Sequence, residues 1–351
     1  MIISQTPYRV SFAGGGTDLP AFYRNEPGAV LSVGLQSHMY VTVSPRFKSS
    51  VRVAYSRTEI AETVAEVEHT IVRTALEMTG LGRHLEITTI GDLPAGTGMG
   101  SSSTLTVGLL NALHAYKGMV SSAPDLAEQA CEIEIDRLGK PIGKQDQYAA
   151  AFGGINYIRF NPDESVQVEP VPCARETVAE IERRSMLVYT AKQRSADGIL
   201  ERQSEGTADK MTTLRAMRDL AGEMRGALAG RGDVDEFATL LDEGWRLKRS
   251  LGFGISSDQI DEMYDTARRA GAQAGKLLGA GGGGFVYLIA PPERHEAILE
   301  ALGQPQQVRF GIDRLGSRVI FISDHPGHCA TRVDQPHADA VRPVSVGEAG
   351  A

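Results

Sequence analysis

Apolar stretches long enough to cross a membrane are missing from this sequence of 351 residues. No uninterrupted apolar run reaches the roughly 18 residues that a spanning helix requires, and the first residues lack the basic start and apolar core of a secretion signal. Cysteine is also scarce: Cys131, Cys173 and Cys329 form no C-x-x-C pair and are too few for a disulfide framework. These absences predict a cytoplasmic protein with no membrane partner.

Long basic stretches and aromatic residues are scarce as well. The formal net charge is −8 and only 6% of the residues are aromatic, which argues against nucleic acid as a partner. An acidic chain can still bind a phosphate-rich small molecule, but it must do so with a local set of donors and not with its overall field. The sequence leaves the oligomeric state open.

What the sequence does contain is a mixture of strand and helix patterns. The first third has segments rich in Val, Tyr and Ser and broken by Gly and Pro, which predict strands. Apolar residues three or four apart predict a helix over 61–79 that ends at Gly80. Longer helical patterns follow over 208–229 and 233–250.

A further helix is expected from Ser256 to Gly271, because Ser256 and Gln259 have the spacing of a capping box and glycine often ends a helix. Strands and helices occur without regular alternation, so the predicted fold class is α+β with two domains. The last stretch, 325–351, is rich in Pro, Ala, His and Gly without periodicity and is expected to be a disordered tail.

The segment LPAGTGMGSSSTLTVGLLNALHAY carries the sharpest signal for a ligand site. Its glycines let the backbone approach a ligand closely, and its serines open a helix whose unpaired N–H groups and positive dipole end suit an anion. No lysine follows the glycines, so this is not a Walker A loop, and a plain glycine-rich turn with a serine cap is the alternative. The candidate ATP-binding residues are Gly96, Gly98, Met99, Gly100, Ser101, Ser102 and Ser103, with a serine hydroxyl available to Mg²⁺.

A second glycine run, KLLGAGGGGFVYLIA, contains the spacing G-x-G-x-x-G from Gly279 to Gly284. A dinucleotide fingerprint leads from a strand into a helix, whereas this run leads into a second strand, so that function is rejected. A plain hairpin needs only one or two glycines. Close packing of the backbone against a ligand or against the first glycine loop explains the run better, with Gly281 and Gly282 as candidate substrate contacts.

Two carboxylates lie between the glycine runs, in EIEIDRLGKPIGKQDQY. Glu134 falls near the end of a predicted helix over 125–138, and a turn broken by Gly and Pro separates it from Asp146. Phosphoryl transfer needs a carboxylate for Mg²⁺ and a second group that orients or deprotonates the attacking hydroxyl, and this pair would supply both. The alternative is a surface helix with solvated charges.

The opening PYRVSFAGGGTDLPAFY displays polar residues at the end of a predicted strand. Arg9 lies on the strand, glycines 14–16 end it, and Asp18 follows. Asp18 would accept hydrogen bonds from two sugar hydroxyls, or, alternatively, from the backbone of its own turn.

These motifs occur in an order that resembles the GHMP kinases, a family that includes galactokinase, homoserine kinase, mevalonate kinase and phosphomevalonate kinase. PYRVSFAGGGTD resembles the first motif of the family, LPAGTGMGSSS the ATP-phosphate motif and KLLGAGGGG the third motif. The resemblance covers about residues 5–325. It implies a ribosomal protein S5 domain 2-like N-terminal domain over 1–184 and a ferredoxin-like C-terminal domain over 185–324.

The resemblance also implies roles for individual residues. Glu134 and Ser102 match Mg²⁺ ligands, Asp146 matches the catalytic carboxylate, and Arg9 matches a cation that would offset charge on the attacking oxygen. The implied activity is ATP-dependent phosphorylation of a sugar hydroxyl, with ATP and Mg²⁺ as cofactors and a small sugar or sugar phosphate as the partner.

One departure narrows the resemblance to a branch of the family. Most members have a Glu-His pair in the first motif, where this chain has Gly15 and Gly16, the candidate substrate contacts beside Asp18. The form GGGTDLPAFY, with YTAKQRSA and WRLKRSLGFGIS, is similar to the D-glycero-D-manno-heptose 7-phosphate kinases. That branch phosphorylates the anomeric C1 hydroxyl of heptose 7-phosphate to give the 1,7-bisphosphate.

An acceptor that already carries a phosphate needs a second anion site. Arg194 in TAKQRSA is the first candidate, because the arginine fork suits phosphate. The other candidates are Lys144, Lys192, Lys248 and Arg249.

Three alternatives remain at this stage. The first is a kinase whose acceptor is an unphosphorylated sugar such as fucose or galactose. The second is an ATP-dependent diphosphomevalonate decarboxylase, and the third is a non-catalytic sensor that binds ATP and sugar. The heptose-kinase-like segments argue against the decarboxylase, and the filled Glu134 and Asp146 positions argue against the sensor.

Overall fold

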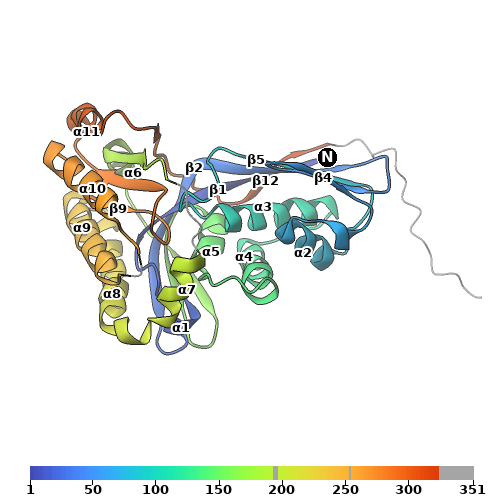
Figure 1. The fold of residues 1–351 in the computed structure, drawn as a ribbon, viewed down its shortest axis with the longest axis horizontal. Helices are drawn as coiled ribbons and strands as arrows, with labels where there is room; N and C mark the ends of the chain where they lie inside the picture. The colour runs from blue at the N-terminus through green and yellow to red at the C-terminus, as the bar shows by residue number, and fades with distance from the viewer. Residues whose placement is uncertain (193–196, 253, 324–351) are drawn as a thin grey trace, which may run out of the picture.

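The computed structural model describes residues 1–192, 197–252 and 254–323, which form two lobes (Figure 1). Each lobe contains both strands and helices, so the predicted α+β class is confirmed. Arg194 and the tail expected over 325–351 lie outside the described residues.

The first lobe is built on an eight-stranded sheet. Its strands are β1 (Ile2–Ala13), β2 (Gly28–Pro45), β3 (Val51–Ala54), β4 (Thr58–Ala61), β5 (Leu85–Gly91), β6 (Ile155–Phe160), β7 (Val166–Pro170) and β12 (Arg318–Ile322). The order is β12-β1-β2-β5-β3-β4, and β6 joins β2 to β7. Strand β2 is 18 residues long, and its first part pairs with β6 while its second part pairs with β5, so one strand serves both halves of the sheet.

Helices cover one face of this sheet (Figure 1). The helical elements of the first lobe are α1 (Pro20–Tyr23), η1 (Val64–Glu66), α2 (Thr70–Thr79), α3 (Ser101–Tyr116), α4 (Ala123–Cys131), the π-helix η2 (Glu132–Arg137) and α5 (Gln145–Phe152). Helix α6 (Arg175–Arg184) follows and contacts α9 (Val234–Ser250) of the second lobe. The helix predicted over 61–79 is shorter, because 58–61 pair as β4 and the regular helix begins only at 70. Gly80 ends it in the left-handed region, as predicted.

The second lobe has a four-stranded antiparallel sheet in the order β11-β8-β10-β9, which is the order of a ferredoxin-like fold. The strands are β8 (Ser185–Tyr189), β9 (Ala274–Leu277), β10 (Phe285–Ile289) and β11 (Gln307–Val308). The helical elements are α7 (Asp197–Glu205), η3 (Ala208–Lys210), α8 (Met211–Leu228), α9 (Val234–Ser250), α10 (Asp258–Ala270), η4 (Pro292–Arg294) and α11 (His295–Ala301).

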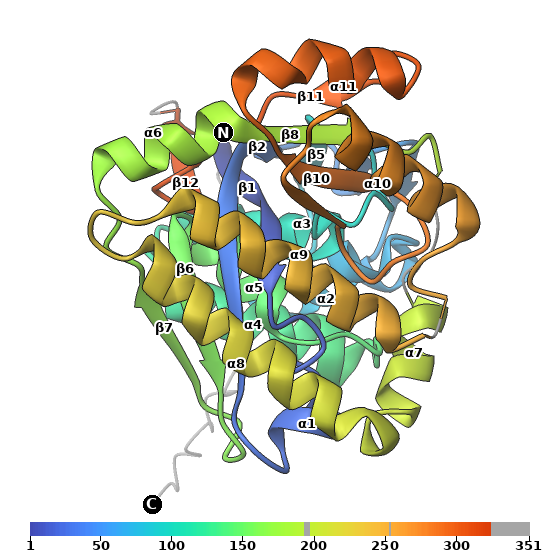
Figure 2. The same cartoon turned by 90° about the vertical axis from the view of Figure 1, so that its left-hand side faces the viewer.

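The two long helices α8 and α9 run side by side (Figure 2), and their apolar stripes face inward. Trp245 is fully buried in the core of this lobe. The capping box predicted for the next helix is wrong, because α10 begins at Asp258 and the Ser256 hydroxyl donates to the Asp261 carboxylate. The predicted end at Gly271, in the left-handed region, is confirmed.

The chain returns to the first lobe at its end. Strand β12 pairs antiparallel with β1, and Leu35 forms a bridge with Ile312. The boundary predicted at 324 therefore needs correction, since a strand at 318–322 belongs to the N-terminal sheet. No strand was predicted over 318–322, and sequence periodicity carries no information about which strand such a segment pairs with.

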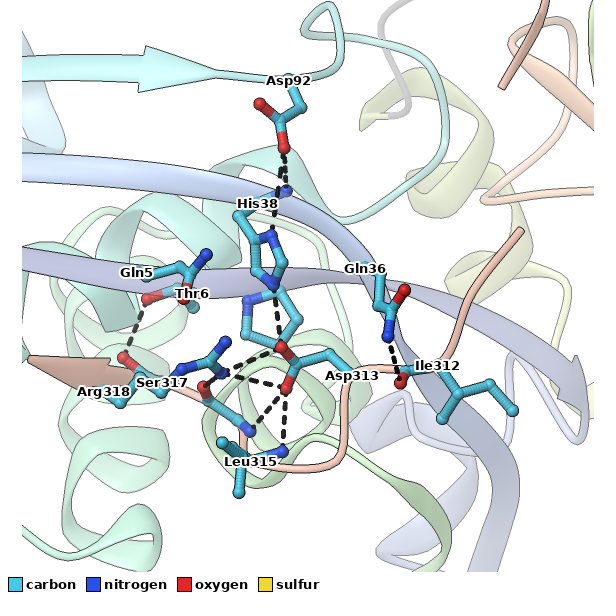
Figure 3. A network of polar contacts seen from close by, with 12 residues as sticks. Gln5, Thr6, Gln36, His38, Asp92, Ile312, Asp313, Leu315, Ser317 and Arg318 are labelled. Carbon is cyan, nitrogen blue, oxygen red and sulfur yellow. Dashed lines mark hydrogen bonds and ion pairs between the residues drawn. The ribbon is translucent and has the colours of Figure 1, made fainter. Parts of the chain in front are cut away.

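A buried polar network fixes this return (Figure 3). Asp313 Oδ2 lies 2.8 Å from His38 Nε2 on β2, and Arg318 Nη1 donates to Oδ2 at 2.9 Å. The backbone N–H groups of Leu315 and Gly316 donate to Oδ1 at 2.8 and 3.0 Å. The Asp313 side chain is 5% exposed, and these donors fill its hydrogen-bonding capacity.

Candidate functional site

A cavity of about 200 Å³ lies where the two lobes meet. The end of β1, the 14–19 turn, the first glycine loop and the turn before α5 contribute from the first lobe, and α7, α9, β9 and the second glycine run contribute from the second. Its polar and glycine lining includes Arg9, Ser11, Gly15, Gly16, Asp18, Gly96, Gly98, Gly100, Ser101, Ser102, Ser103, Lys140, Gly143, Gln145, Asp146, Gln203, Lys248, Lys276 and Gly279. Segments far apart along the chain, such as those that contain Ser11 and Ala280, thus converge on one site.

The first glycine loop leads into the N-terminus of α3, as predicted. Gly100 has φ +76° at the N-cap, and a Cβ there would lie 3.2 Å from Asp146 Oδ2. Glycine therefore allows both the turn and the close approach of the catalytic candidate. Ser101, Ser102 and Ser103 follow and line the cavity, so the free N–H groups of the first helical turn lie beside it. The Met99 side chain is fully buried in the core, so only its backbone is available for the predicted ATP contact.

The two glycine runs pack backbone against backbone. A Cβ on Gly279 would lie 2.4 Å from the Gly98 Cα, and one on Gly284 would lie 2.3 Å from the Thr97 oxygen. This contact accounts for the second run, as the alternative of packing against the first glycine loop anticipated. The predicted substrate contacts Gly281 and Gly282 need correction, because Gly281 packs on Ile255 and the Gly282 N–H donates to the Ile255 oxygen. Neither is among the residues that line the described cavity.

Arg9 and Asp146 form a bidentate ion pair. Arg9 Nε and Nη2 each lie 2.7 Å from one oxygen of the Asp146 carboxylate, and Nη1 donates to the Gly98 oxygen at 2.6 Å. The Arg9 side chain is 5% exposed and that of Asp146 is 22% exposed. The arginine fork thus fixes the carboxylate in orientation and ties it to the glycine loop, while the carboxylate keeps an accessible edge at the cavity.

Glu134 is fully buried, so the alternative of a surface helix is wrong for this residue. It lies in the π-helix η2, a kind of helix that often marks a functional site. Its Oε1 accepts hydrogen bonds from the Ser102 hydroxyl and, at 3.0 Å, from Lys140 Nζ, and its Oε2 accepts one from Gln147 Nε2 at 2.9 Å. Lys140 Nζ also lies 2.6 Å from Ser102 Oγ, so a positive charge already complements the Glu134 and Ser102 oxygens.

Asp18 is held by the backbone of its own turn, which was the alternative to a sugar contact. Its Oδ1 accepts a hydrogen bond from the Gly16 N–H at 2.8 Å, and its Oδ2 lies 3.4 Å from the Gln145 N. Burial raises the pKa of Asp18, these backbone bonds oppose the rise, and the charge on Asp146 adds to it. Asp18 nevertheless lines the cavity.

The glycines at the first motif have a physical reason. Gly16 has φ +103°, and a Cβ there would lie 2.1 Å from Nε2 of Gln203 on α7. Helix α7 therefore occupies the space that a side chain at Gly16 would need. Gly15 has no neighbour closer than 3.8 Å to such a Cβ, so it leaves room in the cavity.

The candidate residues for a second anion site differ in their ion pairs and in whether they line the cavity. Lys144 is ion-paired with Glu164, Arg249 is ion-paired with Asp261, and Lys192 is exposed. Arg194 lies outside the described residues. Lys248 alone of the described candidates lines the cavity.

The sequence analysis missed five polar side chains of the cavity wall: Ser11, Lys140, Gln145, Gln203 and Lys276. Lys140 and Lys276 lie inside segments that carried motifs, GKPIGKQD and KLLGAGGGG, so position within a motif was an available signal. Ser11 likewise lies inside the first motif, PYRVSFAGGGTD, whereas Gln203 gave no local signal, because only tertiary packing brings α7 to the cavity.

Comparison with known proteins is consistent with this architecture. The models for the GHMP kinase N-terminal domain and the GHMP kinase C-terminal domain match residues 62–154 and 224–306. The D-glycero-alpha-D-manno-heptose 7-phosphate kinase of Campylobacter jejuni is 31% identical over 87% of this chain and 94% of its own length. The chain belongs to the GHMP kinase family, whose sugar kinases transfer a phosphoryl group to a hydroxyl acceptor.

Other relatives and solved structures place the chain within that family. A crystal structure described as a D-glycero-D-manno-heptose 1-phosphate kinase from Bacteroides thetaiotaomicron has a TM-score of 0.77 and 28% identity, and covers 92% of this chain and all of its own. The L-fucokinase/L-fucose-1-P guanylyltransferase of Bacteroides fragilis is 24% identical over 83% of this chain but only 34% of its own length.

Within the described residues, no helix is both long and apolar enough to span a bilayer.

Proposed function

We propose that the chain transfers the γ-phosphoryl group of ATP to the anomeric C1 hydroxyl of D-glycero-D-manno-heptose 7-phosphate, giving the 1,7-bisphosphate and ADP. The observation that carries the proposal is the oriented Asp146 carboxylate, held by Arg9 beside the glycine loop and the N-terminus of α3. The heptose is proposed because the Campylobacter jejuni heptose 7-phosphate kinase is similar over nearly the whole chain.

In this proposal the phosphates of ATP lie against Gly96–Ser103 at the N-terminus of α3, where backbone N–H groups and the helix dipole receive negative charge. The C1 hydroxyl approaches the accessible edge of Asp146, which takes its proton as the new bond to the γ-phosphorus forms. The bond between that phosphorus and the bridging oxygen breaks, and ADP leaves with the electron pair. Arg9 holds the carboxylate in position and offsets charge that develops on the oxygens.

Mg²⁺ fits the oxygens of Glu134 and Ser102. They face each other across a hydrogen bond, carboxylate and hydroxyl oxygens are the ligands that this cation prefers, and Lys140 already supplies positive charge at the same atoms. The described residues contain no group of three or more His, Cys, Asp or Glu side chains that would cage a metal. Mg²⁺ bound through two protein oxygens would take its remaining ligands from phosphate and water, and it would neutralise charge on the phosphates.

We also propose a reducing, cytoplasmic location. Cys131 and Cys173 are both free thiols, and burial raises the pKa of each. Cys131 is buried and Cys173 is partly buried, and a raised pKa makes a thiol less reactive, as expected of cysteines that do not form disulfides.

The experiment is phosphorus NMR of the product together with ADP release, using Mg·ATP and five acceptors. These are heptose 7-phosphate, heptose 1-phosphate, unphosphorylated heptose, L-fucose and D-galactose. The proposal predicts turnover on heptose 7-phosphate at least tenfold above the others and a new anomeric phosphate signal. Preferred turnover on heptose 1-phosphate or on a free sugar would contradict the proposed acceptor while keeping the kinase chemistry.

A further inference from the structure

The second lobe contributes two buried lysines to the cavity wall. Lys248 lies near the end of α9 and Lys276 on β9, and they are 8% and 5% exposed. Lysine is rarely buried to this extent unless it has a partner, because a desolvated ammonium group is costly.

Their hydrogen bonds go to backbone carbonyl oxygens. Lys248 Nζ donates to the Gly279 oxygen at 2.5 Å, and Lys276 Nζ donates to the oxygens of Ser11 and Phe12 at 2.8 and 2.9 Å. Among the described residues, neither ammonium group forms an ion pair within 4.0 Å. These bonds fix both lysines in place and leave their positive charges without a direct counter-ion.

The charges that surround the two lysines favour an anion there. Burial lowers the pKa of Lys248 to about 8, Arg9 adds to the decrease, and Asp18 and Asp146 oppose it. The pKa of Lys276 is also lowered, first by burial and then by Lys248 and Arg9. Three cations thus face two carboxylates, one of which already satisfies Arg9. A ligand anion would remove the cost of burying both ammonium groups.

A hydroxyl group lies on the same wall. Ser11 is 8% exposed and lines the cavity, and its Oγ is buried with no hydrogen-bond partner among the described residues. Because Lys276 bonds the carbonyl oxygen of this same residue, the hydroxyl and the ammonium group belong to one corner of the cavity. An unpaired buried hydroxyl is unfavourable in itself and is relieved by an acceptor oxygen.

We propose that Lys248, Lys276 and the Ser11 hydroxyl form an anion subsite that binds the phosphate which the acceptor sugar already carries. The subsite rests on the proposed function, since it assigns the second phosphate of that acceptor to particular residues. Of the predicted candidates that the structure describes, Lys248 lines the cavity, and Lys276 lies on the same wall.

The test is calorimetric binding of heptose 7-phosphate, unphosphorylated heptose and ATP to the full chain and to K248M and K276M. Methionine keeps the length of the apolar stem and removes the ammonium group, with its charge and its hydrogen bonds to the backbone carbonyl oxygens. We expect each variant to bind heptose 7-phosphate about 10- to 100-fold more weakly, the loss typical of a charge-assisted hydrogen bond, with heptose and ATP unchanged within about twofold. K48M, at an exposed lysine on the 46–50 turn, is the matched control and should change none of the three affinities.

Equal losses for heptose and heptose 7-phosphate would overturn the subsite, and a loss confined to ATP would assign the lysines to the nucleotide instead. The proposed acceptor is tested separately by wild-type turnover. If the wild type fails to use heptose 7-phosphate, inorganic phosphate becomes the probe. Lysine-dependent phosphate binding would then support the subsite, and its absence would overturn it.

A second experiment uses only the wild-type protein, so its outcome does not depend on whether a variant folds. An anion that contacts the lysines raises their pKa, so heptose 7-phosphate should take up protons at pH 8.5, above the pKa of Lys248. Calorimetry in two buffers of different ionisation enthalpy measures this uptake, and unphosphorylated heptose should show none. The other charged groups that face the lysines are Arg9, Asp18 and Asp146. Proton release, or equal uptake with both sugars, would contradict the proposal.

Discussion

One network of buried polar groups surrounds Asp313, and another surrounds the cavity between the two lobes. The two networks differ in how many of their buried donors and acceptors have a hydrogen-bond partner. Around Asp313, the carboxylate receives donors from a histidine, an arginine and two backbone N–H groups, and none of the described residues in that network leaves a buried side-chain polar atom unpaired (Figure 3). Around the cavity, the side-chain oxygens Ser11 Oγ, Ser101 Oγ and Gln145 Oε1 are buried without partners.

This difference distinguishes a network that maintains the fold from one that binds a ligand. A complete network stabilises a single arrangement of the chain, and here it fixes the return of β12 to the first sheet. Unpaired donors and acceptors around a cavity are available to a ligand, which supplies the missing hydrogen-bond partners when it binds. We therefore expect substitutions in the first network to change stability and substitutions in the second to change turnover.

The largest effect is expected from D146N. The amide keeps one acceptor for Arg9 but cannot take the hydroxyl proton, so kcat should fall by about 10²- to 10⁴-fold, the range for loss of a general base. The affinity for ATP, measured by calorimetry, should stay within about threefold, because the glycine loop and the α3 N-terminus are unchanged. A kcat within threefold of wild type would show that Asp146 is not catalytic.

The next effect is expected from D313N, on stability. Burial alone would raise the pKa of Asp313, but the bonds from His38, Leu315 and Arg318 prevail and lower it to about 2. The folded-state pKa is therefore below the unfolded value. The carboxylate stabilises the fold fully above about pH 5, contributes about 2 kcal/mol there, and loses this contribution as the pH falls towards 2.

Urea unfolding at pH 7 and pH 3 measures this contribution. D313N should unfold with about 2 kcal/mol less free energy at pH 7, and this deficit should shrink to about half at pH 3, which lies between the folded and unfolded pKa of Asp313. E300Q, at an exposed glutamate on α11, is the control and should change neither value by more than about 0.5 kcal/mol. A D313N deficit that is the same at both pH values would argue that the charge of Asp313 is unimportant.

A smaller effect is expected from G279A, which tests the contact between the glycine runs. Gly279 has φ +70°, and an added methyl group would press on Gly98. The first glycine loop should shift, and ATP should bind about tenfold more weakly, a change of about 1.4 kcal/mol. G303A, at a left-handed glycine with open space around it, is the matched control for backbone strain alone. Equal ATP affinities in the two variants would contradict the role assigned to the contact.

The smallest effect is expected from E164Q. Lys144 and Arg24 pair with Glu164, but the carboxylate is 44% exposed and the Arg24 side chain 64% exposed. Solvent screens such pairs, so the unfolding free energy should change by less than about 1 kcal/mol and kcat should stay the same. A large loss of turnover would show that Lys144 belongs to the acceptor site after all.

The sequence predicted the local parts of the site better than their assembly. The glycine loop, the start of α3 and the end of α2 follow from short-range backbone chemistry. The motifs also predicted Arg9, Glu134 and Asp146 as site residues. The sharing of β12 with the first sheet, the coverage of Gly16 by α7 and the burial of Lys276 depend on contacts between distant segments. Period and propensity carry no information about such contacts.

The most direct test of this account measures kcat and the free energy of urea unfolding on D146N and D313N side by side, with Mg·ATP and heptose 7-phosphate. The account predicts that D146N loses at least a hundredfold in kcat, and that D313N loses about 2 kcal/mol and keeps kcat within twofold. If D313N lost turnover as D146N does, or if D146N kept its kcat, the division between a structural and a functional network would be wrong.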